Sequence, residues 1–220
     1  MLKLRSNRTT AAPPLPSVPL YAGFSRSVRG SLWGRWLTWM IAWFTDAGAK
    51  GATHAFLLYH DDKLGWRTLG ANSDGVSYIS LKQFLATREI VALFLPRTGS
   101  PGSLWDGLAV MRKDIGLPYD YSGVVGMAMV EVAYHWFHDR DAKNPLAERR
   151  ALFCSEFLLD WVRASGFAVL KGVDAAAVDP ERLETALRCS ASFKAAYVVT
   201  SEGALPNISV ASSFPASMKA

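Results

Sequence analysis

Residues 153–163 constrain the possible fold and chemistry of this chain most, because they combine an amphipathic helical pattern with a cysteine at the start of the helix. The apolar residues at helical spacing are Phe157, Leu158, Trp161 and Val162. Gly166 follows as a residue typical of helix ends. A thiol in a first helical turn lies at the positive end of the helix dipole, which lowers its pKa. Cys154 is therefore a candidate nucleophile, and the alternative is a buried structural cysteine.

A histidine far upstream stands at the entry of an apolar run. His54 follows Thr53 and precedes residues 55–59, whose pattern predicts a buried strand. A thiolate nucleophile needs an imidazole as base and ion-pair partner, and the two can be distant in sequence but adjacent in the fold. His54 is therefore a candidate base for Cys154. The alternative is a histidine packed in the core without a chemical role.

The hydrophobic pattern elsewhere predicts one domain at 20–200. Strands are expected at 54–59, 66–71, 76–80 and 90–95, and a helix at 103–115. Residues 1–19 predict a flexible, basic, Pro-rich arm, and residues 201–220 a polar C-terminal tail.

A Trp-rich pattern at 31–45 predicts a further helix with an apolar stripe. It is shorter than the roughly 20 residues that a helix needs to cross a bilayer. A buried helix packed on the sheet is favoured over an interfacial membrane helix, so membrane contact is the less favoured interpretation.

The chain has 220 residues, half of them hydrophobic, and a formal net charge of +5. A domain of this length can bury a substantial core. The positive charge favours an anionic partner or surface, such as a cell-wall polymer, a lipid or a nucleic acid. Because the basic residues are scattered, specific nucleic-acid binding is not expected. No secretory signal is expected, because no long apolar segment follows the basic residues at the N-terminus.

The two cysteines, Cys154 and Cys189, leave two alternatives. They form a disulfide in an oxidising compartment, or Cys154 is free and Cys189 belongs to a helix core. The second interpretation is preferred.

A metal site is suggested by Glu131, His135 and His138, which share helical spacing. The aromatic residues between them favour a structural role, so no metal is expected.

Four residues near the cysteine helix are weaker candidates. Glu156, in the first turn, is expected to serve the exposed N–H groups of the helix or to position substrate. Tyr119 and Tyr121 are candidate hydroxyl donors in a cleft, whereas Asp120 is expected to cap or turn the chain.

Thr53-His54 precedes Cys154-Ser155-Glu156, and the segments 75–85, 90–95, 116–121 and 178–183 accompany them in a fixed order. This order resembles the circularly permuted branch of the NlpC/P60 papain-like family, over about residues 20–187. The resemblance implies an α+β, papain-like fold. In it a central antiparallel sheet packs against helices, and the nucleophile stands at a helix N-terminus.

One position departs from the family pattern. Members usually carry a Glu, sometimes a His, on the strand after the histidine strand, and Gly70 stands there. Asn72 lies two residues on, on the same face of a strand, and an amide can orient an imidazole. Asn72 is therefore the predicted third catalytic residue beside Cys154 and His54. The alternatives are a turn at 72–75, with His54 oriented by water or a backbone carbonyl.

The resemblance implies acyl transfer without a cofactor. His54 deprotonates Cys154, the thiolate attacks an amide or ester carbonyl, and water clears the acyl-enzyme. The expected function is a peptidoglycan-directed endopeptidase or amidase, acting on stem peptides and associated with a phage particle or prophage. Two alternatives remain: a non-catalytic virion or tail protein that retains the fold, and a lipid-acting acyl hydrolase or acyltransferase. The arm at 1–19 is the expected contact for a virion assembly partner.

Overall fold

The computed structural model describes residues 20–28, 51–97, 101–137, 143–147, 151–200 and 203–205. The predicted arm at 1–19 and the predicted Trp-rich helix at 31–45 lie outside these residues.

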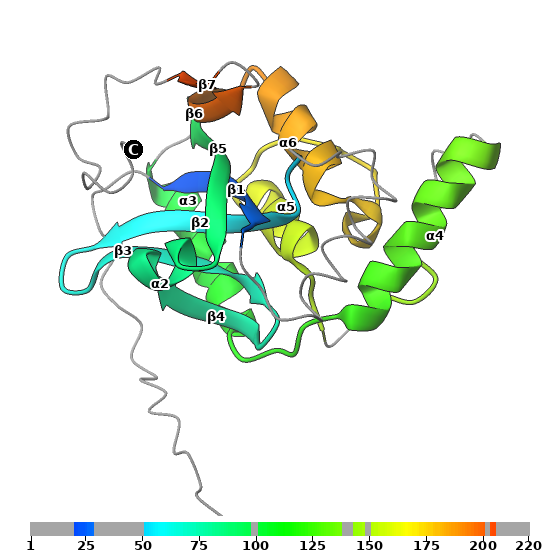
Figure 1. Ribbon diagram of the computed structural model, residues 1–220, viewed down its shortest axis with the longest axis horizontal. Helices are drawn as coiled ribbons and strands as arrows, with labels where there is room; N and C mark the ends of the chain where they lie inside the picture. Colours follow the sequence, from blue (N-terminus) through cyan, green and yellow to red (C-terminus); the bar gives the residue numbers. More distant parts are fainter. Residues whose placement is uncertain are drawn as a thin grey trace, which may run out of the picture.

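Within the described residues, seven strands form one antiparallel sheet in the order β4-β3-β2-β1-β5-β6-β7 (Figure 1). The strands are β1 (Tyr21–Ser27), β2 (His54–Asp61), β3 (Gly65–Asn72), β4 (Gly75–Ser80), β5 (Arg88–Pro96), β6 (Phe193–Thr200) and β7 (Gly203–Leu205). The described helices are α2 (Leu81–Leu85), α3 (Pro101–Met111), α4 (Tyr121–Phe137), α5 (Cys154–Ala164) and α6 (Pro180–Cys189), with the 3₁₀ turns η1 (Arg112–Asp114) and η2 (Ala175–Ala177). The predicted α+β class, with an antiparallel sheet and several helices, is confirmed.

The four predicted strands correspond to β2, β3, β4 and β5, and the predicted helix to α3 with η1. Strands β1, β6 and β7 are not in the prediction. β1 lies at the centre of the sheet, although it contains Ala22 and Gly23, which have low strand propensity. The glycine is required there, because a Cβ at Gly23 would lie 2.5 Å from the ring of Phe56. β7 lies inside the predicted C-terminal tail.

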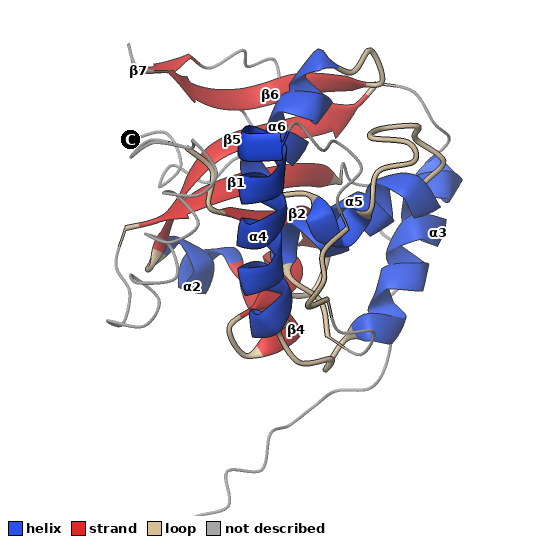
Figure 2. Ribbon diagram, turned by 90° about the vertical axis from the view of Figure 1, so that its right-hand side faces the viewer, coloured by secondary structure: helices blue, strands red, loops and turns tan. Residues whose placement is uncertain are grey.

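The two faces of the sheet bury different clusters. On β2, Ala55, Leu57 and Tyr59 belong to a large core with α3, α5 and α6, which lie on one side of the sheet (Figure 2). Phe56 and Leu58 belong to a smaller core, to which α2 contributes Leu81 and Phe84. This alternation follows from the period of two in a strand, and it decides which way each side chain of β2 points.

Helix α4 lies apart from the sheet (Figure 1). Its inward residues Val124 and Met127 pack on Phe153 and Ala176. Asp120 caps its start, because one carboxylate oxygen accepts hydrogen bonds from the Gly123 N–H at 2.6 Å and from the Ser122 hydroxyl at 2.8 Å. The predicted capping role of Asp120 is therefore confirmed.

The two cysteines are both free. The preferred assignment of Cys189 to a helix core is wrong, since its side chain is exposed at the C-terminal end of α6. The buried stripe of that helix is formed by Leu183 and Leu187 instead. In the described part of the chain, no helix has the length and hydropathy to cross a membrane.

Candidate functional site

Helix α5 places Cys154 at its first residue, as predicted. Phe153 is the N-cap, in extended conformation and without a side-chain capping bond. Its backbone N–H instead donates to the carboxyl group of Glu156, which is one half of a capping box. The expected helix-start role of Glu156 is thereby observed. The start of α5 is also tied to the segment before α6, because the Ser155 hydroxyl donates to the Val178 carbonyl at 2.6 Å.

The Cys154 thiol is buried, and donors surround its sulfur. Burial raises the pKa of Cys154 above its ordinary value. Hydrogen bonds from the backbone N–H groups of Ala55 and Ser155 and from the Tyr119 hydroxyl oppose this rise, as does the charge of Arg88. The protein environment therefore holds a neutral thiol at rest but presents three donors and one cation to a sulfur anion.

Arg88 opens β5 and is half-buried. Its guanidinium lies over the ring of Phe84, 5.9 Å from the centroid. Burial lowers the pKa of Arg88, while Cys154 and Tyr119 raise it. An arginine guanidinium is not deprotonated in proteins, so Arg88 carries its positive charge here. Among the described residues, no carboxylate forms an ion pair with Arg88. The charge of Arg88 therefore lowers the pKa of the Cys154 thiol and of the Tyr119 hydroxyl, and no described carboxylate neutralises it.

His54 is the first residue of β2, as predicted, and its side chain is buried. The imidazole stacks on Phe56, with 6.2 Å between ring centroids and 13° between planes, and lies 6.1 Å from the ring of Phe84. Burial and the charge of Arg88 both lower the pKa of His54 well below 6.5. Its Nε2 atom is buried without a hydrogen-bond partner. The imidazole is therefore neutral at physiological pH.

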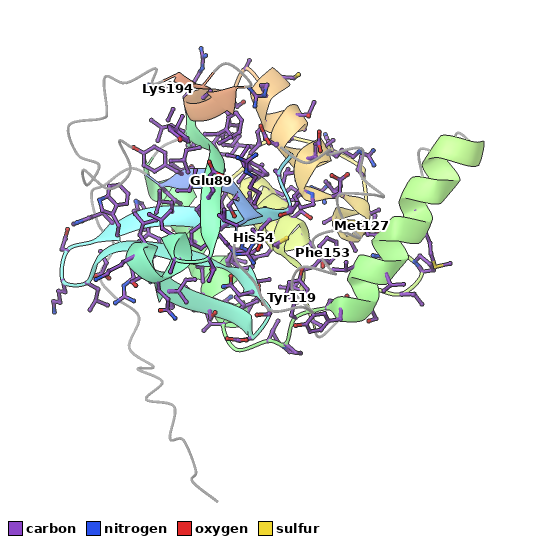
Figure 3. The ribbon with its side chains drawn as sticks, viewed as in Figure 1. His54, Glu89, Tyr119, Met127, Phe153 and Lys194 are labelled. Carbon is purple, nitrogen blue, oxygen red and sulfur yellow. The ribbon has the colours of Figure 1, made fainter. Side chains whose placement is uncertain are left out.

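The structure brings the thiol to the backbone of the residue after His54, but not to its imidazole. The Ala55 N–H donates to the sulfur, whereas the His54 ring contacts Phe56 and Phe84 in the cluster on the other face of the sheet. Cys154 itself belongs to the core of the α5 face. Figure 3 labels His54 and Phe153 in the region between the sheet and α4, with Tyr119 below them. The sulfur of Cys154 is therefore hydrogen-bonded to the backbone next to His54, but Nε2 of His54 forms no hydrogen bond to the sulfur.

Asn72 ends β3, on the same side of that strand as Gly70. Its amide nitrogen donates to the Gly70 carbonyl at 3.2 Å and to the Ser77 hydroxyl at 3.3 Å. These bonds stabilise the turn into β4, in which Gly75 has a φ of +100°. The hydrogen bond by which Asn72 would orient Nε2 of His54 is not formed in this structure, and the orienting role stays a prediction.

Of the remaining sequence candidates, the structure describes Tyr121. The Tyr121 hydroxyl donates to the Ser73 carbonyl at 3.0 Å, and its ring packs edge-on against Tyr119. The side chains of Glu131, His135 and His138 lie outside the described part of the structure. Among the described residues, no group of three or more His, Cys, Asp or Glu side chains is arranged to hold a metal ion.

Arg88 is the residue of this site that sequence reasoning missed. A charged residue before an apolar strand is normally a solvated strand end. Arg88 reaches the site only because β5 pairs with β1, which in turn pairs with β2. Tyr119 carried a weak signal, as an aromatic hydroxyl donor shortly before the cysteine helix.

No protein-family model, curated protein or solved structure matches the chain.

Proposed function

We propose that this protein is a cysteine hydrolase of the permuted NlpC/P60, papain-like type, which transfers acyl groups from an amide or ester to water through Cys154. The observation that supports it best is the set of donors at the sulfur: the Ala55 N–H, the Ser155 N–H and the Tyr119 hydroxyl, with the Arg88 charge nearby. A purely structural cysteine needs none of these. A thiolate, or the oxyanion formed beside it, is stabilised by each of them.

The proposed reaction begins when His54 takes the proton of the Cys154 thiol. The thiolate attacks the carbonyl carbon, and the carbonyl oxygen becomes an oxyanion. Collapse of this intermediate leaves a thioester on Cys154, and the imidazolium returns its proton to the leaving amine or alcohol. A water molecule, deprotonated by His54, then attacks the thioester and releases the acid and the free thiol.

In this structure the imidazole of His54 packs with the cluster on the face of the sheet opposite to Cys154. The first step therefore requires the ring to leave its stack on Phe56 and reach the sulfur past the start of β2, where His54 is the first residue. Catalytic hydrogen bonds are often long or misaligned before substrate binds. Arg88 favours the thiolate and disfavours the imidazolium, because it lowers the pKa of both Cys154 and His54. In this proposal Arg88 is the fixed cation beside the thiolate, while His54 moves the proton.

The proposed substrate is a peptidoglycan stem peptide, and the protein is associated with a phage particle or prophage. This assignment rests on the family resemblance and on the positive net charge of +5, which favours an anionic polymer. Within this proposal, Asn72→Ala tests whether the amide orients His54. A fall in turnover of at least about tenfold supports that role, and an unchanged rate assigns the residue to the turn.

The test uses a Cys189→Ser background, so that Cys154 is the remaining thiol. Purified protein is incubated with peptidoglycan sacculi or with an activated ester, and new amino groups and the mass of the protein are measured. We expect product release with a transient acyl adduct on Cys154. Cys154→Ala should abolish both, and His54→Ala should slow acylation by about a hundredfold or more. Product release by Cys154→Ala at the rate of the background protein would refute the proposal.

The stacking of His54 favours a second candidate, a non-catalytic virion or tail protein that retains the fold. Its imidazole packs like an aromatic core residue, and its Nε2 has no partner. This candidate predicts no acyl adduct on Cys154 with any activated ester between pH 6 and 9. It also predicts that His54→Phe is tolerated without loss of function.

A further inference from the structure

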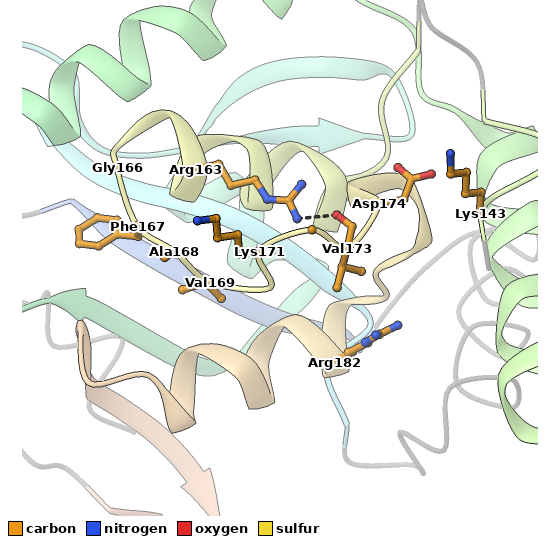
Figure 4. A pocket seen from close by; sticks show the side chains of 11 residues that line it. Lys143, Arg163, Gly166, Phe167, Ala168, Val169, Lys171, Val173, Asp174 and Arg182 are labelled. Atoms are coloured by element: carbon orange, nitrogen blue, oxygen red, sulfur yellow. Dashed lines mark hydrogen bonds between the residues drawn. The ribbon is translucent and has the colours of Figure 1, made fainter. Parts of the chain in front are cut away.

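A cavity of about 780 Å³ lies at the end of α5 opposite to Cys154 (Figure 4). Residues 166–169 and 171–173, from the segment between α5 and η2, form one wall. Arg163 from α5 and Arg182 from α6 contribute to the lining, and Lys143 comes from a separate segment. A cavity of this size lies within the range of about 300–1,000 Å³ that holds small organic ligands.

The charge of this cavity is strongly unbalanced. Its lining contains four cationic side chains, Lys143, Arg163, Lys171 and Arg182, and one carboxylate, Asp174. One oxygen of Asp174 accepts a hydrogen bond from the Ala176 N–H at 3.2 Å, which caps η2. Among the described residues, no ion pair engages Lys143, Lys171 or Arg182. Several cations thus line one concave space without a matching set of anions.

Arg163 has a different role from the other three cations. Its Nη2 atom donates to the carbonyls of Leu170 and Val173 at 2.7 and 2.6 Å, so it holds the wall of the cavity in shape. Asp160, one turn earlier on α5, is its acidic neighbour. Burial raises the pKa of Asp160 to about 6, and the Arg163 charge opposes this rise. The cations left to bind a ligand are therefore Lys143, Lys171 and Arg182.

We infer that this cavity binds a phosphate-bearing ligand, of the diphosphate class. Three cations from three segments can together contact a diphosphate, which has several negative charges and many acceptor oxygens. A ligand with one carboxylate has only one charge and two acceptor oxygens, too few to engage all three. The Arg182 guanidinium suits bidentate contact with phosphate oxygens, and the two lysines act as point charges. The buried side chains of Phe167 and Val169 give the cavity an apolar floor for a non-polar substituent.

The cavity is separate from the thiol site and does not depend on the proposed hydrolase function. Cys154 and Arg163 stand at opposite ends of α5, which places them about 14 Å apart along the helix axis at 1.5 Å per residue. A phosphate bound in the cavity would therefore not contact the sulfur.

The test measures binding of inorganic pyrophosphate to the full-length protein by calorimetry in 150 mM salt, which screens weak surface charge. Lys171→Glu and Arg182→Glu are the test variants. Lys63→Glu is the control, because it makes the same charge change on the exposed β2–β3 hairpin. A second arm measures co-sedimentation with vesicles that contain phosphatidylglycerol, to separate a soluble phosphate ligand from a lipid headgroup.

We expect saturable binding that weakens at least tenfold in Lys171→Glu and Arg182→Glu and less than twofold in Lys63→Glu. Binding of pyrophosphate alone identifies a soluble ligand, and vesicle binding lost in the same two variants identifies a headgroup. Equal losses in all three variants, or no saturable binding in either arm, would overturn the inference.

Discussion

The ionisation of Cys154 is set by competition between burial and the surrounding groups that stabilise a sulfur anion. Burial raises its pKa, while the backbone N–H of Ala55, the charge of Arg88 and the Tyr119 hydroxyl act against that rise. At neutral pH the thiolate fraction is therefore below the few per cent of an ordinary cysteine. Chemistry at this sulfur depends on groups that stabilise the anion once it forms.

Replacing Arg88 by Met tests this balance. Removal of the cation should raise the pKa of Cys154 further and slow its alkylation by iodoacetamide at pH 8, by about three- to tenfold. The measurement is the alkylation rate against pH in the Cys189→Ser background. Lys194→Met, an exposed change on β6, is the control and should leave the rate unchanged. A pH profile of Arg88→Met that superimposes on that of the parent protein would remove Arg88 from the site.

Glu156 makes stability depend on pH in the opposite sense to a paired carboxylate. Burial, followed by the charges of Asp160, Asp120 and Asp174, raises its pKa to about 8, and the Phe153 N–H opposes this. As the pH rises, the unfolded chain loses this proton near pH 4.3, whereas the folded state keeps it until about pH 8. Stability from this group is full below about pH 4.3 and is lost as the pH rises to about 8.

Glu156→Gln should remove that loss, since glutamine keeps the capping geometry without the charge. We expect little difference from the parent protein at pH 4.5 and a gain in unfolding free energy at pH 8.5. The slope between them is at most about 1.4 kcal/mol per pH unit. Urea unfolding followed by tryptophan fluorescence measures it, with the exposed Asp106→Asn as control. A difference between variant and parent that is the same at both pH values would contradict the burial of this carboxyl group.

Among the elements, those that carry the two candidate residues could be predicted, because both have clear periodicity. α5 begins at Cys154 and β2 at His54, as the patterns at 153–163 and 55–59 indicate. The face on which His54 lies could not be predicted in the same way. It follows from the pairing of His54 with Ser25 and from the ring of Phe56, which fits over Gly23. Both contacts depend on β1, whose sequence has weak strand character.

Helix α5 is held at its start by one buried hydrogen bond. Ser155→Ala should lower the unfolding free energy by about 1–3 kcal/mol, because the Val178 carbonyl loses its bond from the serine hydroxyl. Urea unfolding measures the loss. Ser165→Ala is the matched control at the other end of the helix, since that buried hydroxyl has no hydrogen-bond partner. It should be neutral or slightly stabilising, and equal losses in the two variants would exclude the hydrogen bond as the cause.

For the whole molecule, the order of strands in the sheet explains both what the site contains and why sequence patterns could not complete it. β1 lies between β2 and β5, so it connects His54, through Ser25, to the start of the strand that carries Arg88. The first described residues of the chain therefore form the middle of the sheet. Leu20 and Tyr21 are almost completely buried, at 1% and 0% exposure, so the core includes both residues. The boundary near residue 20 stays a prediction.

Two truncations test that boundary. Deletion of residues 1–15 should leave the melting temperature and the reactivity of Cys154 unchanged, because we propose that the arm serves contacts with an assembly partner or an anionic surface and not the folding of the domain. Deletion of residues 1–24 should prevent folding, because it removes Tyr21, Ala22 and Phe24, which are fully buried in the central strand. Thermal unfolding and iodoacetamide labelling of both proteins give the comparison. A loss of stability in the shorter deletion would show that the arm packs on the domain, and its boundary would then lie closer to the N-terminus than residue 20.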